Sequence, residues 1–426
     1  MKQVMVVPSF HCDVVWRRTP GEQTAIRAAQ FSSALNMLAK CPEFRFEFDQ
    51  AAIVREYLAA HPARLKAMRR FIREGRLDIT GGEETIPDTN MVTGEGLVRN
   101  FFLGRLWFEE TLGVRPVVAN LDDAFGLNPQ LPQVFRLFGY RYFREAHTPG
   151  LDLKLARRGI LWEGLDGSRI FYAPAHGHIQ LGTHVCNLPI VYAPMERAQV
   201  SLAETISVDL PVVYCTYSSE EGLVEDRVVD LVLNWPARRG ERIRFALARE
   251  ALVALRRACP RPPVVRGEFN PSQPGTYITR ISLKQAYRRA EWDTIVAESA
   301  AACVALAGSA GRRGQLTGMW RKLAYVQFHD SLCGCHTAPV NRRVMDYCRQ
   351  VSRTAQRLGT EAVRRLHARG GRAPGLVVFN PLPFARREPL EIALPKSMVP
   401  SDANGNPVAA ERWGRMALAV VDLAPL

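Results

Sequence analysis

The sequence lacks any long uninterrupted apolar run. The chain has 426 residues, of which 47% are hydrophobic and 23% charged, a balance typical of a soluble globular protein. No apolar stretch approaches the roughly 18 to 20 residues that are needed to cross a bilayer. The N-terminus also lacks the basic region, long apolar stretch and small-residue cleavage site of a secretory signal. These absences predict a cytoplasmic protein with no membrane partner.

Lysine is scarce among the basic residues. Lys and Arg number 56 against 42 Asp and Glu, which gives a formal net charge of +14, yet only seven of the 56 are Lys. The arginines are scattered, with one denser stretch from Arg238 to Arg266. A nucleic-acid-binding protein would show a basic stripe with interleaved aromatic residues or a recognisable binding module. Neither is present, so the charge predicts a solvated surface and no nucleic-acid partner.

The nine cysteines also lack the spacing of a disulfide framework. Without a secretory signal, reduced thiols are expected. The segment Cys333-Gly334-Cys335-His336 resembles half of a metal knuckle, but no second pair lies at the spacing of a zinc finger. Structural cysteines and a second, weak metal site both remain open for this segment.

Short apolar runs alternate with helical patterns from Met1 to about Cys259. Strands are predicted at Val4–Val7, Phe44–Phe48, Leu77–Thr80, Val117–Leu121 and Tyr142–Arg144, and helices at Thr24–Ala39, Ala51–His61, Pro62–Glu74, Gly94–Gly113 and Pro129–Phe138. This alternation predicts an α/β fold, with a parallel β/α barrel-like catalytic domain over residues 1–265. In such folds the segments just beyond the carboxyl ends of the strands form the functional site.

The pattern changes near Pro260, where proline-rich and glycine-rich breakers form a connector. A helical middle domain is then predicted over residues 274–368, a small bundle of three helices at Ser282–Leu306, Leu316–His329 and Ala338–Ala368. A partial β-rich C-terminal domain is predicted over residues 375–426, with strands at Leu376–Phe379, Leu390–Leu394 and Met416–Val421 and a turn at Asn404-Gly405. Because so short a segment would be a poor independent β-domain, we expect the start of a larger one.

Polar segments follow several of these elements. If the first strand stays extended, His11 and Asp13 point the same way and offer one nitrogen and one oxygen to a metal. Trp16 lies three residues further on and could form the wall of a sugar-sized pocket. Asp122-Asp123 follows a predicted strand, and His329-Asp330 ends a predicted helix. Two His and two Asp from three segments would make a site that suits zinc.

Each of these segments also has an ordinary interpretation. His11 and Asp13 can be neighbouring surface residues, Asp122-Asp123 can cap the helix that follows it, and His329 can be a helix-end cap or a surface histidine. The choice between the two interpretations depends on the rest of the chain.

Six segments in the same order resemble blocks of glycoside hydrolase family 38, the zinc-dependent retaining α-mannosidases. They are His11-x-Asp13-x-x-Trp16; Gly81-Gly82 through Pro87-Asp88-Thr89-Asn90 to Gly94-Glu95 and Leu97-Val98-Arg99; Asp123-Ala124-Phe125-Gly126 with Pro132; Gly275-Thr276-Tyr277 with Thr279-Arg280 and Lys284; Gln327-Phe328-His329-Asp330 with Gly334; and Phe379-Asn380-Pro381-Leu382 with Arg386. The blocks span nearly the whole chain.

This resemblance implies a substrate that is an α-mannoside or a mannose-containing oligosaccharide. It implies one zinc ion per chain, held by His11, Asp13, Asp123 and His329. Asp123 would also be the nucleophile that forms a covalent mannosyl intermediate, with Trp16 under the sugar ring and Asp330 on a sugar hydroxyl. A retaining glycosidase needs one carboxylate that attacks and a second carboxyl that donates a proton, and a nearby cation would keep Asp123 ionised.

The acid/base residue of the family follows a later strand. Here the nearest equivalent is Tyr217-Ser218-Ser219-Glu220-Glu221. We favour Glu220 over Glu221 as the acid/base, and the alternative is that both belong to a solvated acidic loop.

The chain departs from the family in two places. Many relatives carry an aromatic residue where this chain has Glu83-Glu84, and most of the β-domain is missing from the sequence. We therefore expect exposed apolar surface that a homo-oligomer or a partner chain would complete. Three other functions stay open: a catalytically weakened mannoside-binding relative that lacks its full β-domain, a metal-dependent deacetylase-type hydrolase on a similar barrel, and a basic nucleic-acid-binding protein.

Overall fold

The computed structural model of the protein describes residues 1–145, 156–179, 195–218, 221–236, 241–269, 273–308, 312–370, 375–395, 397–402 and 404–426. The chain forms two compact units. The first comprises Met1–Arg288 and Trp320–Arg349, and the second comprises Arg289–Met319 and Gln350–Leu426.

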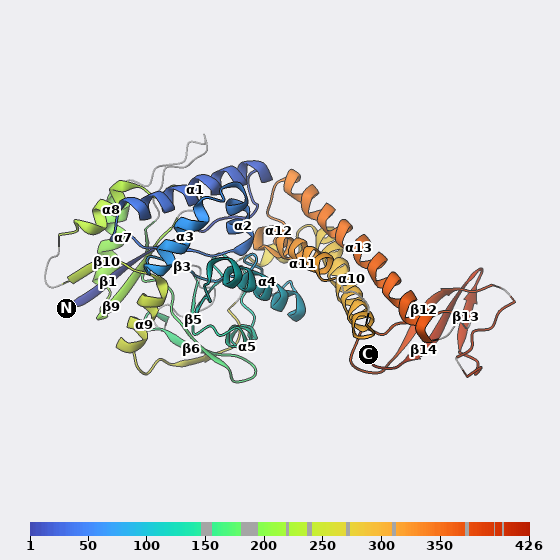
Figure 1. The fold of residues 1–426 in the computed structure, drawn as a ribbon. Helices are drawn as coiled ribbons and strands as arrows, with labels where there is room; N and C mark the ends of the chain where they lie inside the picture. Colours follow the sequence, from blue (N-terminus) through green and yellow to red (C-terminus); the bar gives the residue numbers. More distant parts are fainter. Residues whose placement is uncertain are drawn as a thin grey trace. The chain divides into compact units, whose positions relative to one another are not determined.

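The first unit is built on mainly parallel sheets (Figure 1). Its strands are β1 Lys2–Pro8, β2 Phe46–Phe48, β3 Leu77–Ile79, β4 Val118–Asn120, β5 Tyr142–Arg144, β6 Ile160–Glu163, β7 Arg169–Tyr172, β8 Gly177–Ile179, β9 Val212–Tyr217, β10 Glu241–Phe245 and β11 Val264–Arg266. One sheet has the order β10-β1-β9-β8, a second the order β11-β6-β7-β5-β4, and β2 pairs with β3. The elements predicted between Val4 and Arg144 are all present, with ends that differ by a few residues.

Backbone contacts connect these sheets into an arrangement like an open barrel. Ser9, just past β1, forms a parallel bridge to Glu47 in β2, and the N–H of Gly81, just past β3, donates to Val118 O in β4 at 2.8 Å. Each of the strands β1 to β5 pairs in parallel with a neighbour, and the contacts just described join their carboxyl ends along one edge, where sites of α/β folds form. The predicted α/β class with a parallel, barrel-like sheet is confirmed.

One strand pair breaks the parallel pattern. β6 and β7 form an antiparallel hairpin, with Glu163 opposite Arg169. The turn between them includes Asp166-Gly167, and Gly167 has a φ of +81°, a conformation that glycine adopts without a steric penalty. The apolar runs in this part of the sequence did not indicate these two strands.

Helices cover the sheets of the first unit, and α9 packs on β1 and β9 while α5 packs on β7. They are α1 Pro20–Lys40, α2 Ala51–Ala60, α3 Arg64–Arg73, α4 Gly94–Leu112, α5 Leu131–Leu137, α7 Met195–Ser207, α8 Asp226–Leu233, α9 Ala248–Ala258, the 3-10 helix η1 Pro274–Tyr277 and α12 His329–Cys333. The start of α1 is a capping box: Thr19 N–H donates to Glu22 Oε2 at 2.8 Å, and the Thr19 hydroxyl accepts from Glu22 N–H. The predicted ends of α4 are confirmed, since Thr93 caps its start and Gly113, at a φ of +73°, ends it.

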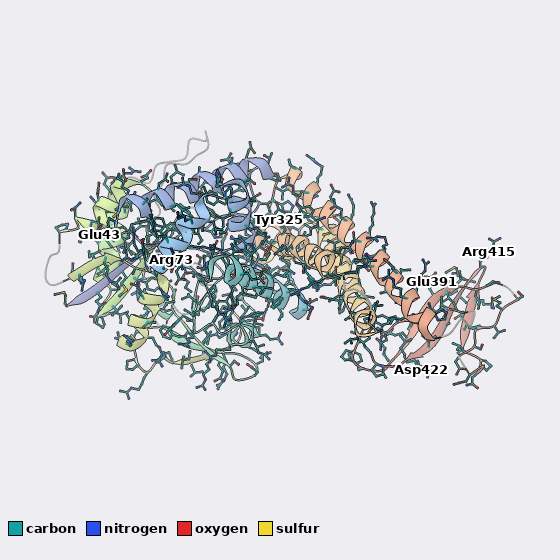
Figure 2. The ribbon with its side chains drawn as sticks, viewed as in Figure 1. Glu43, Arg73, Tyr325, Glu391, Arg415 and Asp422 are labelled. Carbon is teal, nitrogen blue, oxygen red and sulfur yellow. The ribbon has the colours of Figure 1, made fainter. Side chains whose placement is uncertain are left out.

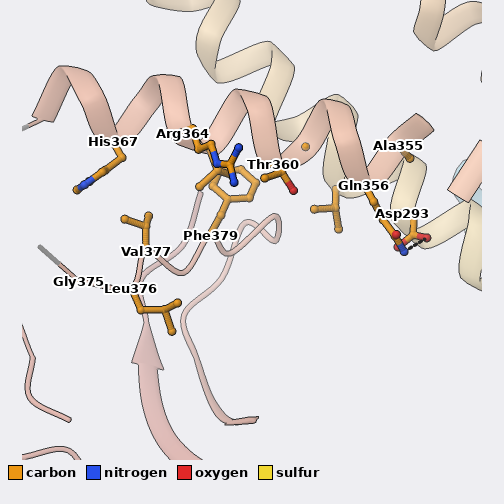
Figure 3. Close-up of a pocket in the computed structure, with 13 residues that line it drawn as sticks. Asp293, Ala355, Gln356, Thr360, Arg364, His367, Gly375, Leu376, Val377 and Phe379 are labelled. Carbon is orange, nitrogen blue, oxygen red and sulfur yellow. Dashed lines mark hydrogen bonds between the residues drawn. The ribbon is translucent and has the colours of Figure 1, made fainter. Parts of the chain in front are cut away.

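Three longer helices were predicted after residue 274, and all are present: α10 Ile281–Leu306, α11 Arg313–Gln327 and α13 Ala338–Gly370. In the second unit, Ala300 and Val304 of α10 pack against Ala362 of α13. A Cβ on Gly359 of α13 would lie 3.6 Å from Ala297 Cα, so the two helices approach closely there. Gln356 Nε2 donates to Asp293 Oδ2 at 3.1 Å beside this contact (Figure 3).

The second unit ends in a small antiparallel sheet of order β12-β14-β13, formed by β12 Arg386–Ala393, β13 Ala410–Trp413 and β14 Met416–Leu423. Figure 2 shows the charged side chains of Glu391, Arg415 and Asp422 on this sheet and its turn. The predicted turn at Asn404-Gly405 is present, with Gly405 at a φ of +85°.

The strand predicted at Leu376–Phe379 is wrong, because this segment is irregular. Phe379 packs against the cluster of Ala300, Val304 and Ala362. Leu376 and Val377 line, with α13, a pocket of about 580 Å³ (Figure 3). The apolar run therefore packs onto helices instead of pairing in a sheet, and periodicity does not distinguish these two uses.

None of the helices in the described ranges combines the length and the apolar character that spanning a membrane requires.

Candidate functional site

Four of the predicted site residues converge at the carboxyl edge of the parallel strands. β1 ends at Pro8, so His11 and Asp13 lie on the loop that follows it and not, as expected, on an extended strand. The loop still brings the two side chains together, with His11 Nε2 3.2 Å from Asp13 Oδ1. His329 begins the short helix α12, and its Nε2 lies 3.9 Å from the same Asp13 oxygen.

The two consecutive carboxylates after β4 have different partners. Asp123 has a φ of +63°, a left-handed conformation that is costly for a residue with a Cβ and that recurs at functional sites. Its Oδ2 lies 3.8 Å from His11 Nε2 and 3.7 Å from His329 Nε2. Asp122 instead lies 3.8 Å from Arg144 Nη2, and the Asn120 amide, with its nitrogen turned toward Asp122, donates to both of its oxygens at 3.0 and 3.2 Å.

The separations among these four side chains fit a single metal ion. Zinc binds nitrogen and oxygen at about 2.0 to 2.2 Å, so the ligand atoms of a tetrahedral site are about 3.4 Å apart. The four N···O separations between these histidines and carboxylates, 3.2, 3.7, 3.8 and 3.9 Å, bracket that value. His11, Asp13 and His329 are buried, and their ligand atoms all lie within 4.8 Å of one another. The residues present therefore fit a zinc ion.

The local field is negative. Burial acts to lower the pKa of His11, but the hydrogen bond and charge of Asp13 and the charges of Asp123 and Asp122 outweigh it, so the pKa lies well above its usual value. Burial, followed by the charge of Asp13, raises the pKa of Asp330 well above its usual range. Such a concentration of buried carboxylates favours a cation among them.

A buried glutamine that sequence reasoning missed connects two of the ligand segments. Gln50 is fully buried, and its Nε2 donates to Cys12 O at 2.9 Å while its Oε1 accepts from Ile86 N–H at 3.0 Å. Cys12 stands between His11 and Asp13. Ile86 O in turn accepts from His329 N–H at 3.0 Å. Gln50 follows a short buried strand and lacks any motif that would have marked it.

A second buried network holds the end of α11, two residues before His329. Gln327 Nε2 donates to Tyr287 Oη at 2.9 Å, and its Oε1 accepts from Asn100 Nδ2 at 2.8 Å. Asn100 Oδ1 accepts from Thr85 N–H at 3.0 Å. The sequence motif included Gln327 but did not indicate this supporting role.

One of the two predicted substrate-binding residues, Asp330, lies beside the four-residue cluster. Asp330 is 3% exposed, and its Oδ2 lies 3.6 Å from His329 Nε2. Trp16 is half-buried, and the guanidinium of Arg17 lies 3.8 Å from its ring centroid. The carbonyl of Trp16 accepts from Thr337 N–H at 3.1 Å, which ties the Trp16 segment to the chain beyond α12.

Of the two candidate acid/base residues, Glu220 lies outside the described residues. Glu221 is 2% exposed, and both of its carboxylate oxygens are bound by Arg18, at 3.3 Å from Nε and 3.2 Å from Nη2. A carboxylate bound through both oxygens to a guanidinium is poorly placed to donate a proton to a leaving group.

Glu83 and Glu84, the pair at which the sequence differs from many relatives, are both buried in the first unit. Glu84 is buried and pairs with Arg55. Glu83 is fully buried, and its carboxyl oxygens have no hydrogen-bond partner from another described residue. Burial raises the pKa of Glu83 well above its usual value, and the charges of Asp49 and Asp122 add to the shift.

Comparison with known proteins identifies the family of this chain. Residues 1–209 match the N-terminal domain of glycosyl hydrolases family 38, and residues 274–366 match the α-mannosidase middle domain. The chain belongs to glycoside hydrolase family 38. The resemblance inferred from the motifs is thereby confirmed.

Curated relatives in this family include α-mannosidase 2C1 of Mus musculus, which is 26% identical over 398 residues, and that of Homo sapiens, 26% identical over 395 residues. Each alignment covers 91% of this chain but 37% of the relative, so the chain spans little more than a third of their length. The fold matches that of an α-mannosidase from Enterococcus faecalis V583 with a TM-score of 0.80 and 20% identity, over 100% of this chain and 54% of that one.

Proposed function

We propose that the chain is a zinc-dependent retaining α-mannosidase that acts through a covalent mannosyl-Asp123 intermediate. The observation that supports this most directly is the difference in exposure within the cluster. The side chain of Asp123 is 33% exposed, whereas those of His11, Asp13 and His329 are 11%, 3% and 0% exposed. A buried set of ligands with one carboxylate open to solvent suits a metal-bound nucleophile.

In this proposal, His11, Asp13, Asp123 and His329 would hold the zinc ion. When bound, zinc would supply positive charge that favours the ionised form of Asp123 and attracts sugar hydroxyls. The left-handed backbone at Asp123 directs its carboxylate away from Arg144 and toward the site.

The bonds that form and break in the reaction involve two carboxyl groups of this chain and one water molecule. The Asp123 carboxylate attacks the anomeric carbon while the glycosidic C–O bond breaks, and a second carboxyl gives its proton to the departing oxygen. The same group later takes a proton from the water that cleaves the mannosyl ester. We propose Glu220 for this role, since its neighbour Glu221 is engaged by Arg18. Asp330 would accept a hydrogen bond from a sugar hydroxyl, and Trp16 would pack against the ring.

The wider predictions belong to the same proposal. The substrate would be an α-mannoside or a mannose-containing oligosaccharide. The three-part division of the chain at residues 1–265, 274–368 and 375–426, the cytoplasmic location, and a homo-oligomer or partner chain that completes the β-rich region remain predictions.

Metal content and hydrolysis of an aryl α-mannoside test the proposal together. Wild type is expected to hold about one zinc per chain and to release the phenol. His329→Ala should lose both the metal and the activity. His61→Ala, which removes an exposed histidine at the end of α2, is the matched control and should keep both.

The chemistry is tested separately from the metal. A slowly hydrolysed fluorosugar of mannose should leave one sugar attached to Asp123, with release of fluoride, and Asp123→Asn should remain unlabelled. Zinc without turnover or labelling would favour a mannoside-binding relative. Hydrolysis of acetylated sugars without a covalent adduct would favour a deacetylase-type reaction. A wild-type chain without metal would contradict the proposed ligand set.

A further inference from the structure

The proposed reaction assigns no role to the segment Cys333-Gly334-Cys335-His336. This segment nevertheless contacts Asp330, a residue of the site. Cys335 is exposed, and its Sγ lies 2.8 Å from Asp330 Oδ1. The other oxygen, Oδ2, faces His329. Among the described residues, the Cys335 thiol is the hydrogen-bond donor to this carboxylate.

The geometry of the loop from Cys333 to Thr337 is firmly held. Gly334 has a φ of +82°, and a Cβ at this position would lie 2.9 Å from Thr279 Oγ1. Arg280 binds the loop backbone, with Nε donating to Gly334 O and Nη2 donating to His336 O, both at 2.8 Å. Backbone contacts on both sides of Cys335 therefore fix the position from which its thiol reaches Asp330.

Further contacts attach the same loop to Asp330 and Trp16. His336 Nδ1 donates to the backbone oxygen of Asp330 at 2.8 Å, and Thr337 N–H donates to Trp16 O at 3.1 Å. One loop thus contacts both residues that the proposed function assigns to the sugar.

The Asp330 carboxylate needs such a donor. Asp330 is nearly buried, so little water reaches its carboxyl oxygens. A thiol of ordinary pKa, about 8.5, carries its proton at neutral pH. The thiol can therefore donate to Oδ1 and fix the rotation of the carboxylate.

We propose that Cys335 is a positioning residue for sugar binding, whose thiol orients the Asp330 carboxylate to accept a hydrogen bond from a hydroxyl of an α-mannoside. This inference rests on the proposed function. It also assigns a role to a sulfur that would otherwise be read as structural or as part of a second metal site.

The test compares Cys335→Ala and Cys335→Ser with Cys303→Ala, which removes a thiol on α10 in the second unit. For each, the affinity for methyl α-mannoside is measured by calorimetry, together with KM and kcat for an aryl α-mannoside, zinc content and Tm. A hydrogen bond to a charged group is worth enough to predict about tenfold weaker sugar binding and a higher KM in Cys335→Ala. Zinc content and Tm should not change, Cys335→Ser should recover to within about threefold of wild type, and Cys303→Ala should match wild type.

A double-mutant cycle with Asp330→Ala shows whether Cys335 acts through Asp330. The double variant should bind the sugar no more weakly than Asp330→Ala alone. A loss of affinity equal to the product of the losses in the two single variants would overturn the inference. Wild-type affinity in Cys335→Ala, or a loss of zinc or Tm in it, would also overturn the inference. If wild type neither binds nor hydrolyses the mannosides, the proposed function fails and the inference fails with it.

Discussion

Two buried glutamines of the first unit should respond in opposite ways to the same substitution. Gln50 is 0% exposed and Gln23 is 1% exposed. The amide of Gln50 bonds Cys12 O and Ile86 N–H at 2.9 and 3.0 Å. Neither amide atom of Gln23 has a hydrogen-bond partner among the described residues. Replacement by Met keeps the approximate length of each side chain and removes the amide.

In Gln50→Met, two backbone groups lose their partners inside the protein. Each buried polar group left unpaired costs about 1 to 3 kcal/mol, so a loss of about 2 to 6 kcal/mol is expected for the two groups. For a unit of this size that is a fall in Tm on the order of 5 to 15 °C. Gln23→Met removes an unpaired amide from the interior and should raise Tm by a few degrees.

The same pair of variants separates stability from the metal site. Gln50 connects the loop of His11 and Asp13 with the segment that holds His329, and loss of such supporting contacts typically lowers metal affinity by about 10- to 100-fold. Zinc affinity, measured by competition with a chelating dye, should fall in Gln50→Met and not in Gln23→Met. The reasoning is refuted if Gln50→Met keeps the wild-type Tm, or if Gln23→Met destabilises the protein as much as Gln50→Met does.

Two further predictions concern the segment after β3. Because Glu83 has a folded-state pKa above its unfolded value, its contribution to stability is full below about pH 4.5 and is lost as the pH rises toward the folded-state pKa. Glu83→Gln stays neutral, so its Tm should exceed that of wild type by an amount that grows as the pH rises above about 4.5, and a constant difference would contradict the assignment. Gly104→Ala should cost several kcal/mol, since its Cβ would lie 2.2 Å from the carbonyl carbon of Glu83. Gly94→Ala on the same helix meets nothing within 4 Å and should fold like wild type; equal yields and Tm for both alanine variants would show that the chain shifts to admit the methyl group.

Local pattern was sufficient to predict the regular elements at the start of the chain. The five strands and five helices proposed before residue 145 are present, because apolar periodicity, caps such as Thr93 and Gly113, and short connections all act over a few neighbouring residues. The same local patterns missed the β6–β7 hairpin and misassigned Leu376–Phe379. In both places the decisive factor is what the segment packs against, and that partner is far away in the sequence.

The residues of the site were also named from sequence, but their arrangement was not. The sequence by itself determined which side chains are available: two imidazoles and several carboxylates in segments that follow strands or end a helix. The tertiary structure decided that Asp123, and not Asp122, faces the two histidines, since that depends on a left-handed turn and on Arg144 from the neighbouring strand β5.

The supporting contacts depended entirely on tertiary structure. Gln50 has no sequence signal, because a glutamine is equally compatible with a surface or an interior position. The pattern around Cys335 resembled half of a metal knuckle and did not indicate a contact with Asp330. The partners of these two residues are Cys12, Ile86 and Asp330. The sequence specifies the chemical groups one residue at a time. The distances between those groups, which decide whether they form a site, depend on contacts between segments that are brought together only when the chain folds.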